Sequence, residues 1–166
     1  MSAPTDWERL WAPHRLPYLQ GVDKPQGCVF CGADSISSNS DLIVKRGQHC
    51  YVVMNLYPYN SGHLLVCPYR HVAELTELTD AEAGELHQLT KSAMQALRQA
   101  SGAQGFNIGL NQGTVSGAGI ADHLHQHIVP RWQGDTNFMP IIGSTKVLAQ
   151  LLTDLRDLLV QAWPDA

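Results

Sequence analysis

Three histidines alternate with other residues at positions 123, 125 and 127, within the segment DHLHQHIVP (122–130). Alternate side chains of a β-strand point to the same face, so this alternation predicts a strand that carries three imidazoles about 6.6 to 7 Å apart. Such a row is costly in an apolar core, because each ring has two nitrogens that need partners. Three interpretations are open: a solvent-facing polar strand, a three-histidine metal site, and a catalytic row.

A glycine-rich loop, QGTVSGAG (112–119), comes directly before the histidine row and favours the catalytic interpretation. Glycine allows backbone N–H groups to approach a ligand closely and to point at an anion. Backbone amides and imidazoles together suit a phosphate whose charge grows in the transition state. A histidine in such a place can also be the nucleophile and form a covalent phosphoramidate.

The hydrophobic pattern of the 166 residues predicts one α+β domain with a mostly antiparallel sheet. A long helix is predicted over 79–100, because Thr79 and Glu82 form a capping-box pattern, an apolar stripe follows at helical spacing, and Gly102 ends it. The predicted strands are 41–47, 49–56, 63–69, 105–111 and 122–130, and the other predicted helices are 5–11 and 144–162.

Composition and charge exclude several classes of function. The formal net charge is -4 and no basic stripe is present, which counts against a nucleic-acid partner. No apolar run approaches the roughly 18 residues that would span a bilayer, and the N-terminus lacks the order of a signal peptide. We therefore expect a cytoplasmic protein without disulfides.

The four cysteines divide into two pairs of different character. Cys50 and Cys67 lie in apolar runs and are expected to be buried core thiols. Cys28 and Cys31 form a C-x-x-C pair with zinc-knuckle spacing, which needs two further ligands from elsewhere in the fold. The alternative is two ordinary thiols in a loop.

The segment HLHQHIV (123–129) resembles the pattern of the histidine triad family, His-φ-His-φ-His-φ-φ with φ apolar. Gln126 departs from it at the second φ and is expected to face away from the triad. The resemblance extends over about residues 28–138, through NLYPYNSGHLLVCPYRHV (55–72), the long helix and FNIGLNQG (106–113). It is strongest to the bacterial group that includes diadenosine tetraphosphate phosphorylases and Fhit-like dinucleoside polyphosphate hydrolases, through WAPHRLPYL, NLYPYNSGHLLV, PRWQGDTNF and IIGSTKV.

The resemblance implies a fold, an organisation and an assembly. The fold would be HIT-like, with about five antiparallel strands, one long helix and a C-terminal helix. The chain would form a single domain over 1–166, with an N-terminal extension (1–27), a motif-bearing core (28–138) and a C-terminal helix (139–166). Family members commonly dimerise through the long helix and an edge strand, so a homodimer is expected.

The resemblance also implies the roles of individual residues. His125 would be the nucleophile, His127 would contact the phosphate, and His63 would support the histidine network. The substrate contacts would be Asn55 near the ribose, Asn111 near the phosphate or leaving group, and backbone amides of Gly117, Ala118 and Gly119. Gly119 stands where the family usually has a polar side chain. A structural zinc would be held by Cys28, Cys31, His71 and His123, and no organic cofactor is expected.

The implied reaction is attack of His125 on the α-phosphate of an adenine nucleotide, such as a diadenosine polyphosphate. Water as the second nucleophile would release AMP, and inorganic phosphate would make the protein a diadenosine tetraphosphate phosphorylase. The sequence leaves this choice open. A slow or inactive nucleotide-binding regulator is an alternative of another class. A DNA-end deadenylating enzyme is a further rival, against which the acidic charge balance counts.

Overall fold

The computed structural model describes residues 27–31, 40–135 and 151–164. The chain divides into two units, and all of these residues lie in the unit formed by Pro25–Asp135 and Leu148–Ala166. No helix in these described ranges is long and apolar enough to cross a membrane. The predicted division of 1–166 into an extension, a core and a C-terminal helix stays a prediction, because the remaining residues lie outside the described ones.

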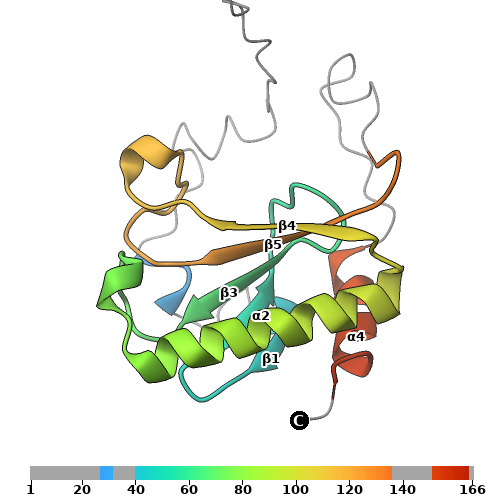
Figure 1. Ribbon diagram of the computed structural model, residues 1–166, viewed down its shortest axis with the longest axis horizontal. Helices are drawn as coiled ribbons and strands as arrows, with labels where there is room; N and C mark the ends of the chain where they lie inside the picture. The colour runs from blue at the N-terminus through green and yellow to red at the C-terminus, as the bar shows by residue number, and fades with distance from the viewer. Residues whose placement is uncertain (1–26, 32–39, 136–150, 165–166) are drawn as a thin grey trace, which may run out of the picture. The chain divides into compact units, whose positions relative to one another are not determined.

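Five antiparallel strands form one sheet in the order β1-β2-β3-β5-β4 (Figure 1). The strands are β1 (Ile43–Arg46), β2 (Cys50–Met54), β3 (Leu64–Pro68), β4 (Gly105–Leu110) and β5 (Gln126–Arg131). Helix α2 (Asp80–Ser101) packs on β2, β3 and β5, while helix α4 (Leu152–Gln161) packs on β1 and on α2. The predicted α+β class and the HIT-like five-stranded sheet are thereby confirmed.

Helix α2 begins and ends where its local sequence predicts. The Thr79 hydroxyl accepts a hydrogen bond from the Glu82 N–H, and the Glu82 carboxylate accepts one from the Thr79 N–H, which completes a capping box. Gly102 closes the helix with a left-handed backbone, φ 65°. Cys50 and Cys67 are fully buried, as expected.

The strand pleat assigns His127 to the sheet face opposite α2. Gln126 faces α2, because its Nε2 donates to the Thr90 hydroxyl on that helix at 2.7 Å. Its neighbour His127 must then point to the other face, as Gln126 was predicted to face away from the triad. On that second face His127 lies opposite Leu65 of β3 in the strand register.

Two element boundaries differ from the sequence prediction by more than two residues. Strand β5 begins at Gln126, so His123 and His125 precede it in a segment outside the regular ladder. In that segment the Leu124 N–H donates to the carbonyl of Val72, which lies beyond the end of β3. Strand β3 ends at Pro68, and a proline has no N–H that could donate to a neighbouring strand. Helix α4 begins only at Leu152, since Leu151 has an extended backbone. The predicted helix at 5–11 and residues 144–150 lie outside the described residues.

Three short 3₁₀ turns lie in the connections between the described helices and strands. These turns are η3 (Ser40–Leu42), η4 (Leu75–Glu77) and η5 (Thr114–Ser116). η4 precedes α2, and η5 lies within the predicted glycine-rich loop between β4 and the histidine segment.

Candidate active site and metal site

Four imidazoles and one phenyl ring form a continuous row on the sheet face opposite α2. The ring centroids of His125 and His127 are 5.0 Å apart, and those of His127 and His63 are 5.1 Å apart. The Phe30 ring packs 5.4 Å from His123 and 5.0 Å from His125. The structure therefore brings together the three predicted catalytic histidines, although only His127 lies in a strand.

The hydrogen bond of His125 fixes which of its nitrogens can attack. Its Nδ1 lies 2.8 Å from the His123 carbonyl oxygen, which only accepts, so Nδ1 carries the proton. The lone pair of a neutral ring is then on Nε2, the nitrogen at the far end of the imidazole. The side chain is only 7% exposed, and this burial lowers the pKa of His125, opposed by the bond to the carbonyl. Burial thus favours the neutral imidazole, and the hydrogen bond to the His123 carbonyl defines which of its nitrogens is nucleophilic.

A second set of hydrogen bonds fixes the proton positions of His63 and His127. The Tyr59 N–H can only donate, and it lies 2.9 Å from His63 Nδ1, so this nitrogen is an acceptor. In a neutral His63 the proton is then on Nε2, which lies 2.9 Å from His127 Nδ1 and donates to it. A neutral His127 in turn carries its proton on Nε2. His127 therefore presents a donor N–H, suited to an oxygen of a phosphate.

The two predicted asparagines lie at the two ends of this hydrogen-bonded pair. The Asn55 side-chain oxygen accepts the Tyr57 N–H at 2.9 Å, which turns its amide nitrogen toward His63 Nδ1 at 3.3 Å. The side-chain amide nitrogen of Asn111 lies 3.5 Å from His127 Nε2. This nitrogen can only donate, so the donor role of His127 Nε2 requires the Asn111 amide to present its oxygen instead. Asn55 thus orients a histidine, and its predicted contact with a ribose stays a prediction.

The predicted backbone donors lie on the loop between Asn111 and the histidine segment. Gly113 and Gly117 have φ of 74° and 81°, in the region that side chains rarely adopt. The Ser116 N–H and hydroxyl both donate to the Gly113 carbonyl, which closes the η5 turn. Contacts of Gly117, Ala118 and Gly119 with a substrate stay predictions.

The four predicted metal ligands converge from three distant parts of the chain. One ligand atom from each of Cys28, Cys31, His71 and His123 lies within 4.8 Å of the others. The distance from His123 Nδ1 to the sulfur is 3.2 Å for Cys28 and 3.5 Å for Cys31, and His71 Nδ1 lies 3.1 Å from the Cys31 sulfur. A tetrahedral zinc would separate neighbouring sulfur and nitrogen ligands by about 3.5 Å. The geometry of the cluster fits such an ion.

The other nitrogen of His123 supports the same interpretation. Its Nε2 lies 2.9 Å from the carbonyl oxygen of Pro68, so Nε2 carries the proton and Nδ1 directs its lone pair at the two sulfurs. A metal-binding histidine commonly donates its second ring N–H to a backbone carbonyl in this way. His123 is also almost fully buried, at 1% exposed, which holds the ring in place.

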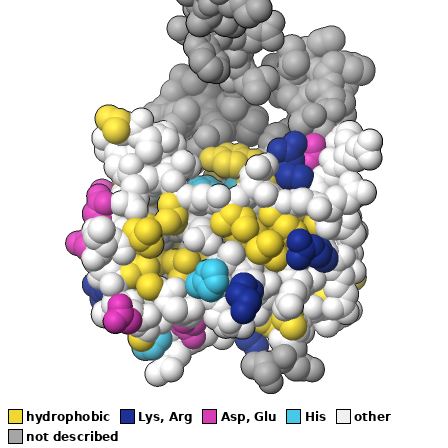
Figure 2. Space-filling model, viewed as in Figure 1, with side chains coloured by type: hydrophobic (Ala, Val, Ile, Leu, Met, Phe, Trp, Pro, Cys, Tyr) yellow, Lys and Arg dark blue, Asp and Glu magenta, His cyan; other side chains and the backbone are white. Residues whose placement is uncertain are grey.

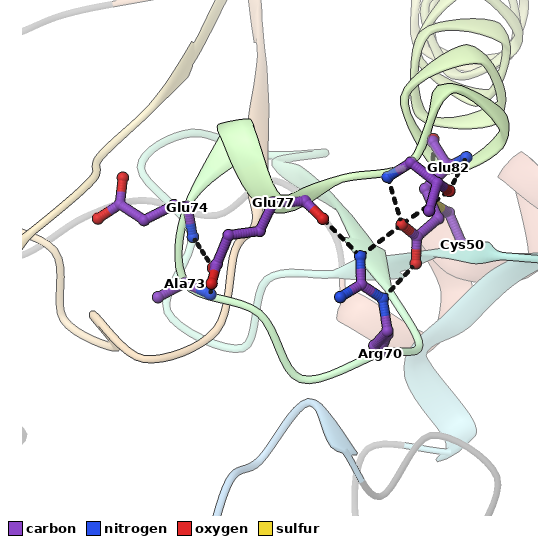
Figure 3. Close-up of polar contacts among 7 residues, drawn as sticks. Cys50, Arg70, Ala73, Glu74, Glu77 and Glu82 are labelled. Atoms are coloured by element: carbon purple, nitrogen blue, oxygen red, sulfur yellow. Dashed lines mark hydrogen bonds and ion pairs between the residues drawn. The ribbon is translucent and has the colours of Figure 1, made fainter.

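The segment that carries His71 is held by a polar network at the N-terminus of α2 (Figure 3). The Arg70 guanidinium makes two hydrogen bonds to the Glu82 carboxylate, at 2.7 and 2.9 Å, and a third to the Glu77 carbonyl at 2.7 Å. The pair with Arg70, opposed by burial and aided by the Thr79 N–H, lowers the pKa of Glu82 to about 2. Arg70 thereby ties the residue next to His71 to the cap of α2.

Two residues that take part in the site were not predicted from the sequence. Phe30 packs against both His123 and His125, and its carbonyl accepts the Tyr51 hydroxyl at 2.8 Å, which anchors the C-x-x-C turn to β2. Tyr59 sets the proton position of His63 through its backbone N–H, and its ring stacks on His127 at 5.5 Å. A backbone donor leaves no trace in residue types, and the one hint for Phe30 is its place between the two cysteines.

The fold and the row of histidines define a histidine triad protein. The family model described as HIT domain matches residues 37–134, more than half of the chain, and the chain belongs to this family. This match includes His63, His71 and all three triad histidines.

Two relatives named for an enzymatic activity and one solved structure are similar to the chain. A protein of Mycobacterium tuberculosis named AP-4-A phosphorylase is 46% identical, over 94% of this chain and 84% of its own length. The asymmetrical bis(5'-nucleosyl)-tetraphosphatase of Schizosaccharomyces pombe is 35% identical, over 49% of this chain and 44% of its own. A zinc-bound histidine triad family protein of Mycobacterium smegmatis has the same fold, with a TM-score of 0.68 and 23% identity over 82% of this chain and 92% of its own.

Proposed function

We propose that the protein is a nucleotidyl-transfer enzyme that cleaves dinucleoside polyphosphates, with diadenosine tetraphosphate as a substrate. The observation that carries this proposal is the hydrogen bonding of two neighbouring histidines, His125 and His127. His125 offers a lone pair on Nε2, and its neighbour His127 offers an N–H. A nucleophile beside a donor suits attack on a phosphate and stabilisation of its oxygens.

The reaction would proceed in two steps through a covalent intermediate. His125 Nε2 attacks the α-phosphorus, an N–P bond forms, and the P–O bond to the rest of the polyphosphate breaks, so that ATP leaves from diadenosine tetraphosphate. The donor N–H of His127, aligned by His63, would stabilise the charge on the phosphate oxygens. A second nucleophile then breaks the N–P bond and frees His125.

Inorganic phosphate is the second nucleophile that we propose, with water as the alternative. The support is the name AP-4-A phosphorylase of a relative that matches nearly the whole chain. The tetraphosphatase relative, which matches about half of the chain, favours water. With phosphate the products would be ATP and ADP, and with water they would be ATP and AMP.

We also propose that Cys28, Cys31, His71 and His123 hold a structural zinc ion. Support comes from the convergence of their ligand atoms and from the Pro68 carbonyl that orients His123. A zinc with four protein ligands has no open position for substrate, so its contribution would be to hold the C-x-x-C turn against the histidine segment. His125, two residues from His123, would be positioned by that attachment.

A homodimer and a cytoplasmic location complete the proposal. The edge strand β4 leaves one side of its backbone unpaired within the sheet, and its Ile108 side chain is 45% exposed. Figure 2 shows hydrophobic side chains gathered between α2 and this edge. The location is supported by the four cysteines, none of which forms a disulfide, as expected in a reducing compartment.

Product analysis tests the proposed reaction. Wild-type protein is incubated with diadenosine tetraphosphate, with and without inorganic phosphate, and the nucleotides are separated by chromatography. ADP that appears only with phosphate identifies a phosphorylase, and AMP without phosphate identifies a hydrolase. Absence of turnover in both conditions would contradict the proposed function and would favour a nucleotide-binding regulator.

A further inference from the structure

The side chain of Gln112 joins the start of the glycine-rich loop to the turn before α2. Its amide oxygen accepts the Leu75 N–H at 3.2 Å, and its amide nitrogen donates to the carboxylate of Glu74. A backbone N–H can only donate and a carboxylate can only accept, so each end of the amide meets the partner that it requires. These two hydrogen bonds therefore fix the orientation of the Gln112 side-chain amide.

The turn before α2 that Gln112 contacts is itself stabilised by hydrogen bonds. The Glu77 carboxylate accepts the N–H groups of Ala73 and Glu74, at 3.1 and 3.0 Å, and the Glu77 carbonyl accepts the Arg70 guanidinium. Arg70 in turn is paired with Glu82 at the N-terminus of α2. In Figure 3 the Glu74 carboxylate points away from Arg70 and from the Glu77 carboxylate. This direction places it to accept the amide of Gln112.

Residues 113–117 of the loop beyond Gln112 have few other attachments among the described residues. A side chain added at Gly113 or Gly117 would meet nothing within 4 Å, and Val115 is fully exposed. The hydrogen bonds of Ser116 close the loop on its own Gly113 and do not tie it to the sheet. At the other end, Gln112 follows Asn111, whose side chain lies 3.5 Å from His127.

We propose that Gln112 is a positioning residue, which holds the start of the glycine-rich loop in place for the phosphates of the substrate. The proposal rests on the proposed function, because it assigns to that function a residue that does not touch the reacting atoms. A loop released at Gln112 would sample more conformations before binding, so substrate would bind more weakly, whereas bound substrate would still meet His125 in the same geometry. The loss should therefore appear in KM and not in kcat.

A charge swap separates this role from a general effect on folding. In Gln112→Glu the new carboxylate can still accept the Leu75 N–H, but it faces the Glu74 carboxylate and repels it. In the double variant Glu74→Gln/Gln112→Glu, the amide of residue 74 can again donate to the carboxylate of residue 112. Gln88→Glu, the same change at an exposed position of α2, is the matched control.

The steady-state kinetics of diadenosine tetraphosphate cleavage are the first measurement. Gln112→Glu should raise KM about three- to tenfold, as expected for one partly exposed polar contact, with kcat within about twofold of wild type. The double variant should restore KM, and Gln88→Glu should leave it unchanged. A wild-type KM in Gln112→Glu, a fall in kcat alone, or no recovery in the double variant would overturn the proposal.

Hydrogen exchange of the amides in 113–119 is the second measurement, and it needs no activity. Exchange should be faster in Gln112→Glu than in wild type and should return to the wild-type rate in the double variant. Unchanged exchange in Gln112→Glu would overturn the proposal even if the enzyme is active. Faster exchange in a protein whose wild type cleaves no dinucleoside polyphosphate would support the attachment of the loop and contradict only the proposed function.

Discussion

At the scale of single residues, two histidines in one short segment commit opposite ring nitrogens to the backbone. His123 donates from Nε2 to Pro68 and leaves Nδ1 for the two cysteine sulfurs. His125 donates from Nδ1 to the carbonyl of His123 and leaves Nε2 for chemistry. Two histidines of the same row thus have different roles. Their hydrogen-bond partners determine these roles, and the alternating sequence pattern alone does not.

This difference predicts separate effects of two neighbouring substitutions. His123→Ala should lose bound zinc and lower the stability of the protein, because it removes one of four ligands and a buried ring. His125→Asn should keep the zinc content and the fold but abolish turnover. Metal content of the purified variants, determined by mass spectrometry, and their thermal unfolding check both expectations. A full zinc content in His123→Ala would contradict the proposed ligand set.

The sequence predicts the residues of the site better than their contacts. The triad, His63, Asn111 and the C-x-x-C pair are all visible as motifs, and the family resemblance relates them to one another. Phe30 and Tyr59 were missed, because they act through a ring contact and a backbone N–H that only the folded chain creates. The attachment of Gln112 to Glu74 joins residues 38 positions apart, and no local pattern indicates it.

At the scale of elements, boundaries that depend on neighbouring residues were predicted and those that depend on distant partners were not. The cap of α2 at Thr79 and its end at Gly102 follow local rules, and the structure has both. The start of β5 depends on where its neighbour β3 ends, at Pro68. Strand β5 begins four residues later than predicted. Sequence alternation continues through His123 and His125, so it could not mark this boundary.

Substitutions at two glycines test the backbone geometry of the connection between β2 and β3, which carries His63. Gly62 has φ of 77°, and an added side chain would lie 3.0 Å from Leu97 Cδ2 and 3.3 Å from Pro130 Cγ. Gly62→Ala should therefore lower the free energy of unfolding by at least about 1 to 2 kcal/mol, through backbone strain and crowding. Urea unfolding measures the change.

The matched control lies in helix α2. Gly84 has an ordinary helical backbone with open space at the position of a side chain. Gly84→Ala should raise the free energy of unfolding by about 0.5 to 1 kcal/mol, because alanine favours the helix. Equal stability changes in the two variants would contradict the assigned turn geometry at Gly62.

At the scale of the whole molecule, one face of the sheet packs against a helix and the other carries the candidate active site. Helix α2 covers the first face, and the histidine row with the C-x-x-C turn occupies the second. Strands β2 and β3 lie between these two layers and are buried at every position, so they read as continuous apolar runs in the sequence. The edge strand β4 remains exposed on both faces at its centre.

The exposed edge predicts the effect of one substitution on assembly. If the protein is a homodimer through α2 and β4, Ile108→Glu should shift it toward the monomer, because each subunit would bring a charge into the interface. Light scattering coupled to size-exclusion chromatography measures the mass. Val160→Glu, at a similarly exposed position of α4, should leave the mass unchanged. A dimer that persists in Ile108→Glu at low protein concentration would contradict this interface.

Direct detection of the covalent intermediate tests the central claim, that His125 is the nucleophile. Wild-type protein is mixed with diadenosine tetraphosphate, quenched within milliseconds to seconds, and digested for mass spectrometry at a pH that preserves the N–P bond. We predict one adenylyl group on the peptide that contains His125, localised to that imidazole by fragmentation and absent from His125→Asn. An adenylyl group on another residue, or full turnover by His125→Asn, would contradict the account.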